Sequence, residues 1–177
     1  MVLRTFPTPQ LAINQLAAQG VVSVDGRDWG GSSGIIIKPG IVVTAEAAPE
    51  RDDEINVILP DGQEVTATVA GRDPTTDDIA VLRVGGCDLT EAKAATLPLP
   101  GAIVIGVGRV GKDVVASLGS IALVGEAWRS SQGGLTEARI RVDITLRRAT
   151  EGGALVNAEG NPPREQARLR AVNRFGV

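Results

Sequence analysis

Short hydrophobic runs, separated by turn residues, recur along most of the chain. In several of them apolar and polar positions alternate, and runs of this kind bounded by Gly, Pro and Asp are typical of β-strands. The expected strands are Val21–Val24, Gly34–Lys38, Ile41–Thr44, Ile55–Leu59, Glu64–Arg72, Ile79–Val84, Ala102–Val107, Val114–Leu123, Leu135–Ile144 and Ala154–Val156. Pro39-Gly40 and Pro60-Asp61-Gly62 are tight-turn sequences that join neighbouring runs as hairpins. Regularly spaced short strands favour an all-β sandwich or closed barrels.

One segment near the N-terminus has a different pattern. Thr8-Pro9-Gln10 offers a helix N-cap with proline at the first helical position, and Gly20 supplies a stop. The apolar positions between them give the helix an apolar side: Leu11, Ile13, Leu16 and Ala17. We therefore expect a short N-terminal helix that packs against the β-structure.

The chain length of 177 residues fits one domain or two small barrels that share an interface. Glycine and proline residues are concentrated between the sixth expected strand and the seventh, as in a linker. The predicted organisation is an N-terminal arm and helix at 1–19, a first β-barrel at 20–85, a linker at 86–98 and a second β-barrel at 99–177.

Composition narrows the class of protein. With 43% hydrophobic and 22% charged residues the chain is typical of a globular protein, and with 2% aromatic residues its core must be aliphatic. A net charge of −3 argues against a nucleic-acid partner. The single cysteine, Cys87, permits neither an internal disulfide nor a thiolate metal cluster. We expect no metal and no other cofactor.

The sequence offers no membrane or export signal. No run approaches the roughly 18 apolar residues of a membrane span, and no basic segment followed by an apolar stretch opens the chain. We expect a cytoplasmic protein with no membrane partner, although a trimmed chain would look the same. Residues 46–78 are rich in acids and residues 129–177 in arginine. These segments are either two solvated faces or surfaces that attract each other, within one chain or head to tail between copies.

Several separated segments together resemble one protein family. Asp78–Leu82 is similar to the strand that carries the aspartate of trypsin-like peptidases, and Glu151–Asn157 is similar to their S-G-G-x-L-V serine turn. Asp143 precedes Glu151 by the interval that separates the family's T-D-A aspartate from its serine. Further similar segments, in the family's order, are Gly31–Ile37, Ile41–Ala48, Ile55–Gly62, Gly71–Pro74, Gly106–Gly108 and Ala116–Ala122. Over about residues 17–160 the chain therefore resembles the HtrA/Deg type of trypsin-like peptidases.

The resemblance implies an all-β fold of two antiparallel six-stranded barrels with the catalytic groups between them. It places Ala47 in the histidine slot, Asp78 in the aspartate slot and Glu151 in the serine slot. Ala149 falls in the slot of the glycine that forms the oxyanion hole. A serine hydroxyl attacks a peptide bond only when a base takes its proton, and that base is usually histidine. The chain contains no histidine anywhere.

These replacements predict that the chain is not an enzyme. The carboxylate of Glu151 is a poor nucleophile toward an amide, and its negative charge stands where a substrate oxyanion would form. Ala149 accepts a positive φ less readily than glycine does. We expect a non-catalytic pseudoprotease that serves as a protein- or peptide-binding or assembly module. Its vestigial cleft, near Ala47, Asp78, Ala149 and Glu151, is the expected groove.

Catalytic alternatives stay open. The runner-up is an active trypsin-like hydrolase with an unrecognised catalytic group, and Asp78 with Glu151 would form an acid–base pair if their pKa values were pushed apart. The remaining candidate nucleophiles, one of them with Lys112 as its base, are Ser32, Ser33, Ser117, Ser120, Ser130 and Ser131. The glycines of the segment 106–111 match a dinucleotide-binding G-x-G-x-x-G, although no predicted helix follows them.

The C-terminal sequence departs from the family pattern. Pro162 and Pro163 break any strand at that point, and only Leu169–Val177 can add a β-segment or a short helix. The second barrel therefore either closes unusually or keeps an open edge. Because open edges invite pairing with another chain, we expect a homo-oligomer.

Overall fold

The protein is all-β, as predicted. The computed structural model describes residues 18–25, 31–45, 49, 52–73, 79–85, 99–129, 133–136, 139–145 and 147–157. Ala18 and Gln19 are helical, and the rest of the predicted N-terminal helix lies outside these residues. The predicted linker and the C-terminal segment after residue 157 also lie outside them. None of the helices in the described ranges is long and apolar enough to cross a membrane.

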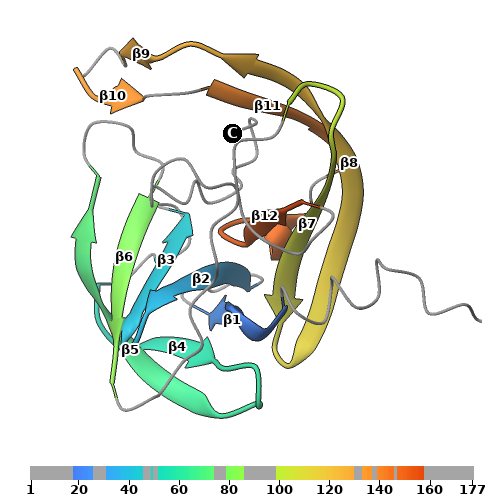
Figure 1. The fold of residues 1–177 in the computed structure, drawn as a ribbon. Helices are drawn as coiled ribbons and strands as arrows, with labels where there is room; N and C mark the ends of the chain where they lie inside the picture. The colour runs from blue at the N-terminus through green and yellow to red at the C-terminus, as the bar shows by residue number, and fades with distance from the viewer. Residues whose placement is uncertain are drawn as a thin grey trace, which may run out of the picture.

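The first half of the chain forms a closed six-stranded antiparallel barrel (Figure 1). Its strands follow the order β1-β2-β3-β6-β5-β4. Their bounds are β1 Val21–Asp25, β2 Ser32–Lys38, β3 Ile41–Ala45, β4 Ile55–Ile58, β5 Glu64–Arg72 and β6 Ile79–Val84. The two predicted turns join β2 to β3 and β4 to β5, each pair antiparallel. The predicted hairpins are confirmed.

The interior of this barrel is aliphatic, because alternate positions of each strand point inward. Its fully buried side chains are Val22, Val24, Ile36, Val42, Ile55, Val57, Leu59, Ala67, Leu82 and Val84. Each buried Val, Leu or Ile contributes about 1.5–3 kcal/mol relative to an exposed one. The low aromatic content therefore does not prevent a complete core.

The second half forms a four-stranded antiparallel sheet in the order β11-β8-β7-β12. The strands are β7 Ile103–Val110, β8 Asp113–Gly125, β11 Arg139–Ile144 and β12 Ala154–Val156. A separate two-stranded ribbon pairs β9, Trp128–Arg129, with β10, Leu135–Thr136. Within the described residues this sheet does not close into a six-stranded barrel, which agrees with the open-edge alternative.

The prediction of one strand over Leu135–Ile144 is wrong. The segment forms two strands, because its partner changes: β10 pairs with β9 and β11 pairs with β8. The segment that pairs with it is also interrupted, at Glu126-Ala127 between β8 and β9. Opposite Arg141 and Val142 the register shifts, because Ala122 of β8 is an extra, bulged residue.

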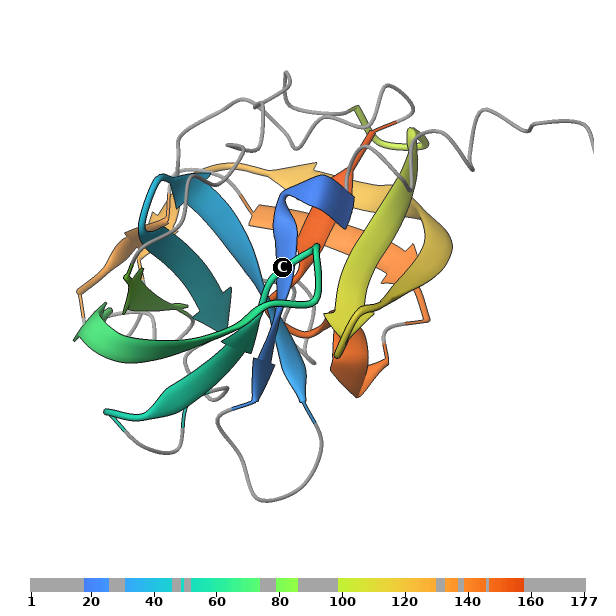
Figure 2. The ribbon, with the colours of Figure 1, turned by 90° about the horizontal axis from the view of Figure 1, so that it is seen from below.

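The two halves pack directly on one another. Figures 1 and 2 show β1 and β2 beside β7 and β12. The contact is an apolar cluster of Val21, Ile35, Ile105, Val107, Ala154 and Val156. The opposite face of the second sheet forms its own cluster around Val104, Ile121, Ile140 and Leu155. The turn that carries Ala149 and Glu151 lies at this interface, where it is hydrogen-bonded to Ser33 of β2.

Candidate functional site

Strand pairing brings the histidine and aspartate slots to one end of the first barrel. β3 and β6 are antiparallel, and the last residue of β3, Ala45, is paired with the first residue of β6, Ile79. Ala47 follows Ala45 by two positions and Asp78 immediately precedes Ile79, so both slots leave the barrel at this end. Ala47 and Asp78 themselves lie outside the described residues, and their roles stay predictions.

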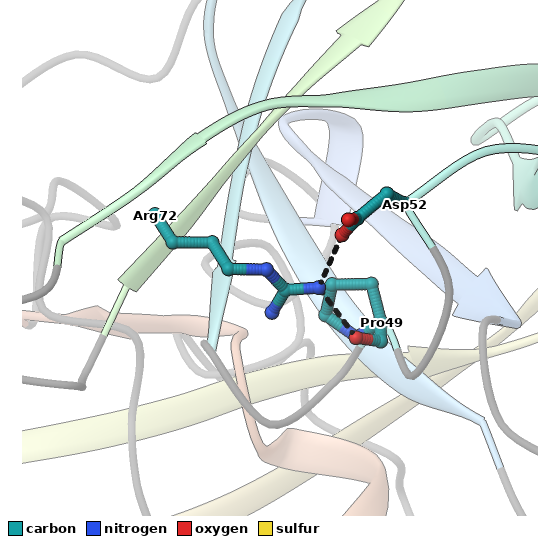
Figure 3. Close-up of polar contacts among 3 residues, drawn as sticks. All are labelled: Pro49, Asp52 and Arg72. Carbon is teal, nitrogen blue, oxygen red and sulfur yellow. Dashed lines mark hydrogen bonds and ion pairs between the residues drawn. The ribbon is translucent and has the colours of Figure 1, made fainter.

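Hydrogen bonds hold the described residues next to these two slots, and Figure 3 shows those made by Arg72. The Asp73 N–H donates to the carbonyl of Ile79 at 3.0 Å and so closes the base of the loop that contains Asp78. Arg72 Nη2 donates to the Pro49 carbonyl and to Asp52 Oδ1, both at 2.9 Å. Because Asp52 is exposed, that ion pair contributes little. The bond to Pro49 holds the chain just after the histidine slot.

The serine slot lies in a tight turn between β11 and β12. Residues Arg148–Thr150 form one turn of 3₁₀-helix. Thr150 is fully buried, and its N–H and its hydroxyl donate to the Arg147 carbonyl at 2.9 and 2.7 Å. Gly153 N–H donates to the Thr150 carbonyl at 3.0 Å. Thr150 thus holds the turn by bonding to Arg147 before it and to Gly153 after it.

In this turn the backbone N–H of the serine-slot residue, which an oxyanion hole requires, already makes a hydrogen bond within the chain. In a trypsin-like enzyme the backbone N–H of the serine-slot residue and that of the residue two positions earlier converge on the oxyanion. Here the N–H of Glu151 donates to the Arg148 carbonyl at 3.0 Å. Among the described residues only Glu54 combines a side chain with positive φ, so Ala149 does not adopt that conformation. The N–H of the serine slot therefore makes its hydrogen bond inside the 3₁₀ turn.

Ser33 links the turn to both halves of the protein. Its fully buried hydroxyl donates to the Ala149 carbonyl at 2.6 Å and accepts the N–H of Arg109 at 2.7 Å. Its backbone N–H donates to the Glu151 carbonyl at 2.7 Å. The Ser33 carbonyl accepts the Thr44 hydroxyl at 2.6 Å. One residue of β2 therefore holds β3, β7 and the serine-slot turn together.

Gly152 is the residue that allows this close approach. Its φ is +78°, a conformation that favours glycine. A Cβ at this position would overlap the Ser33 carbonyl oxygen and the Thr44 hydroxyl. The nearest atoms include the backbone nitrogen of Ala45, so the serine-slot turn lies against the end of β3. The serine slot and the exit points of the other two slots are therefore neighbours in space.

A buried arginine that sequence analysis did not single out lies behind the site. Arg109 is 4% exposed, and its guanidinium donates to the carbonyls of Ala18, Val21 and Lys112 at 2.7–2.8 Å. Burial lowers the pKa of Arg109, and the nearby Asp113 partly offsets this effect. In sequence Arg109 looks like an ordinary charge at a hairpin end, so no local signal identifies it.

The predicted site residues in the described part of the chain lie together. Ala149 and Glu151 are both half-buried in the serine-slot turn. Asp143 is exposed on β11, opposite Ser120 of β8. The separation of Asp78 and Glu151 lies outside what the structure describes, and an acid–base pair stays a hypothesis.

Several of the alternative chemistries lose support. Ser32 and Ser33 are buried, and the Ser32 hydroxyl donates to the Val24 carbonyl at 3.3 Å. Ser130 and Ser131 lie outside the described residues. The glycine pattern of 106–111 lies on β7 and on the hairpin to β8, so no helix N-terminus awaits a phosphate. The described residues contain no group of three His, Cys, Asp or Glu side chains that could hold a metal ion.

Comparisons with known proteins agree with this arrangement. A model of the trypsin-like peptidase domain matches residues 32–162. The "Putative serine protease HhoB" of Synechocystis sp. is 32% identical over 143 residues, which cover 77% of this chain and 34% of that protein. The "Probable periplasmic serine endoprotease DegP-like" of Pseudomonas savastanoi is 34% identical over 133 residues, or 72% of this chain and 27% of that protein. The chain thus spans about a third of the length of these curated relatives.

A solved structure has the same fold. The crystal structure titled "Rv3671c protease, inactive form" superposes with a TM-score of 0.67 at 22% identity, over 88% of this chain and 81% of that one. Its identity is too low to carry more than the fold. The family match covers most of the chain, and the relatives are of the HhoA, HhoB, DegP and DegS kinds. The chain belongs to the trypsin-like peptidase family, in its HtrA/Deg branch.

Proposed function

We propose that this protein is a pseudoprotease, a non-catalytic member of its family that acts as a protein- or peptide-binding or assembly module. The observation that carries the proposal is the bond from the Glu151 N–H to the Arg148 carbonyl. An oxyanion hole works because preorganised donors point at the developing charge. Here the donor of the serine slot is turned inward, and a carboxylate takes the place of the hydroxyl.

The sequence adds an independent argument. With no histidine in the chain and alanine in the histidine slot, no imidazole can serve as the general base. The members of a triad act as a unit, so removing one of them already costs most of the rate. Without base and nucleophile, only the oxyanion hole and substrate binding could still accelerate the reaction. The inward donor would then be a third obstacle, separate from the other two.

A peptidase assay tests the proposal directly. The purified protein, incubated with casein and with a broad set of fluorogenic peptides, is expected to give no turnover above a buffer control. Peptide cleavage that is lost in Glu151→Gln would contradict the proposal and favour the runner-up, an active hydrolase with an unrecognised catalytic group.

Restoring the family's residues separates the three obstacles. The variant Ala47→His/Glu151→Ser recovers base and nucleophile, and the variant that adds Ala149→Gly also frees the turn to aim its donors. We expect the triple variant to cleave at least about tenfold faster than the double variant, since one oxyanion donor typically accounts for 10²–10³ in rate. Equal rates would show that the inward turn is not an obstacle.

The proposed binding groove is the vestigial cleft at Ala47, Asp78, Ala149 and Glu151. Peptides selected for binding from a random display library are expected to bind Glu151→Arg at least about tenfold more weakly. Asp61→Arg is the matched control, because Asp61 lies in the β4–β5 turn at the other end of the barrel. A cytoplasmic location is the accompanying proposal, and fractionation of the native host tests it against the periplasmic naming of three relatives.

A further inference from the structure

Arg109 is a buried cation whose hydrogen-bond partners are neutral. Its guanidinium donates to the carbonyls of Ala18, Val21 and Lys112. Burying a charged group costs free energy, and an apolar side chain would fill the same space without that cost. What arginine supplies is a planar fork of donors that bonds several acceptors in a fixed geometry. The three bonds therefore fix the end of β7 against the chain that enters the first barrel.

The main chain of Arg109 faces the hydroxyl of Ser33. The Arg109 N–H donates to that hydroxyl at 2.7 Å, and the Arg109 carbonyl oxygen lies 3.3 Å from it. The Ala149 carbonyl oxygen lies 2.6 Å from the same hydroxyl. A hydroxyl has one proton to donate, so the two carbonyls compete for it. The shorter distance gives the proton to Ala149.

The position of β7 decides this competition. If the Arg109 carbonyl moved about 0.5 Å toward Ser33, it would reach the usual O–H···O distance and compete for the proton. The Ala149 carbonyl would then lose its donor, and the serine-slot turn would lose its bond to the side chain of β2. The guanidinium opposes such a movement, because it ties the same residue to three carbonyls on its other side.

We propose that Arg109 is a positioning residue for the proposed groove, and that it couples residues 18–21 to the serine-slot turn through the Ser33 hydroxyl. This coupling rests on the proposed binding function and gives it a means of regulation. A partner that displaces residues 18–21 also releases the turn. Because coupling between two sites is reciprocal, a peptide held by the turn also stabilises residues 18–21 in place.

Amide exchange at Glu151 measures the coupling, because the N–H of Glu151 is bonded inside the turn. Arg109→Met is expected to speed this exchange about tenfold, the effect of losing about one hydrogen bond. Ser33→Ala is expected to speed it as well, and the double variant no further than Ser33→Ala alone, because Arg109 acts through Ser33. Should the methionine variant not fold, Arg109→Lys takes its place, since lysine keeps the charge without the fork.

A core variant separates this role from a general loss of stability. Leu82 is fully buried inside the first barrel, in a cluster that contains neither Arg109 nor Ser33. Leu82→Ala leaves a cavity there and lowers overall stability. It is expected to leave amide exchange at Glu151 unchanged.

The other end of the coupling offers a matched pair of substitutions. Ala18 is 4% exposed and its carbonyl accepts Arg109 Nη2, whereas the adjacent Gln19 is exposed. Ala18→Leu overfills a buried position and displaces that carbonyl, so exchange at Glu151 is expected to rise as it does in Arg109→Met. Gln19→Leu adds a leucine of the same size at an exposed position and is expected to leave the exchange unchanged.

Four outcomes would overturn the proposal: unchanged exchange at Glu151 in Arg109→Met, additive effects of Arg109→Met and Ser33→Ala, equal effects of Arg109→Met and Leu82→Ala, and equal effects of the two leucine variants. None of these measurements needs a ligand or turnover. A protein that shows the coupling but cleaves peptides would refute the pseudoprotease and leave the role of Arg109 standing. An inactive protein with additive effects would do the reverse.

Discussion

Replacing Ser33 by alanine should lower the free energy of unfolding far more than the loss of one hydroxyl group suggests. The substitution removes only a hydroxyl, yet that hydroxyl accepts the buried N–H of Arg109 and donates to the Ala149 carbonyl. A buried donor or acceptor left without a partner costs about 1–3 kcal/mol. The Arg109 N–H is fully buried and the Ala149 carbonyl is partly buried, so we expect a loss of about 3 kcal/mol in the free energy of unfolding. For a chain of this size that loss lowers Tm by about 6–12 °C.

The neighbouring serine provides the control. Ser32 lies on the same strand and is equally buried, but its hydroxyl makes one long bond, 3.3 Å, to the Val24 carbonyl. Ser32→Ala should therefore cost about 1 kcal/mol or less. Urea denaturation of both variants gives the free energies, and amide exchange at Glu151 reports on the turn itself. Faster exchange at Glu151 is expected in Ser33→Ala alone.

The comparison can fail in two ways. Equal losses in the two variants would mean that burial of a serine, rather than its bonds, sets the cost. A large loss in Ser33→Ala with unchanged exchange at Glu151 would mean that Ser33 stabilises the contact between the halves but does not hold the serine-slot turn. Either result would refute the role of Ser33 as the residue that holds the serine-slot turn through its bonds.

Three further changes have sharply different expected costs. Gly152→Ala should cost about 3 kcal/mol or more, by chemical denaturation, because it adds overlap with Ser33 to positive-φ strain, whereas Gly62→Ala has the same strain in open space and should cost about 1–2 kcal/mol. Arg109→Met should cost about 3–5 kcal/mol in the same assay, because two buried carbonyls and one part-buried carbonyl lose their donor, and a loss under about 1 kcal/mol would contradict the role of the guanidinium. Asp52→Asn should change stability by less than about 0.5 kcal/mol and Arg72→Met by about 1–2 kcal/mol, because the bond to the Pro49 carbonyl matters more than the exposed ion pair. Equal effects would contradict that ranking.

The local pattern of apolar, polar and turn residues predicts the strands correctly, except where a strand changes its pairing partner. The alternation and turn residues of the first half identify six strands and two hairpins, because each is decided within a few neighbouring residues. The segment Leu135–Ile144 also has a strand-like pattern, but its division into β10 and β11 depends on where β8 gives way to β9. Ser33 appears in sequence as one of several candidate nucleophiles. Its buried bonds to residues 76 and 116 positions away show it to be a structural link.

By itself, the sequence determined which chemical groups are present. It has no histidine, and no arrangement of the chain can supply an imidazole that it lacks. The resemblance to the family then predicts alanine in the histidine slot and a carboxylate in the serine slot. Only the tertiary structure decided where the backbone donors point, because the bond from Glu151 to Arg148 depends on a turn held by Ser33 from a distant strand. It also decided that Arg109 is buried and that the second sheet stops one pair of strands short of closure in the described residues. Identity of residues is local information, whereas burial, closure and donor direction arise from contacts between segments far apart in the chain.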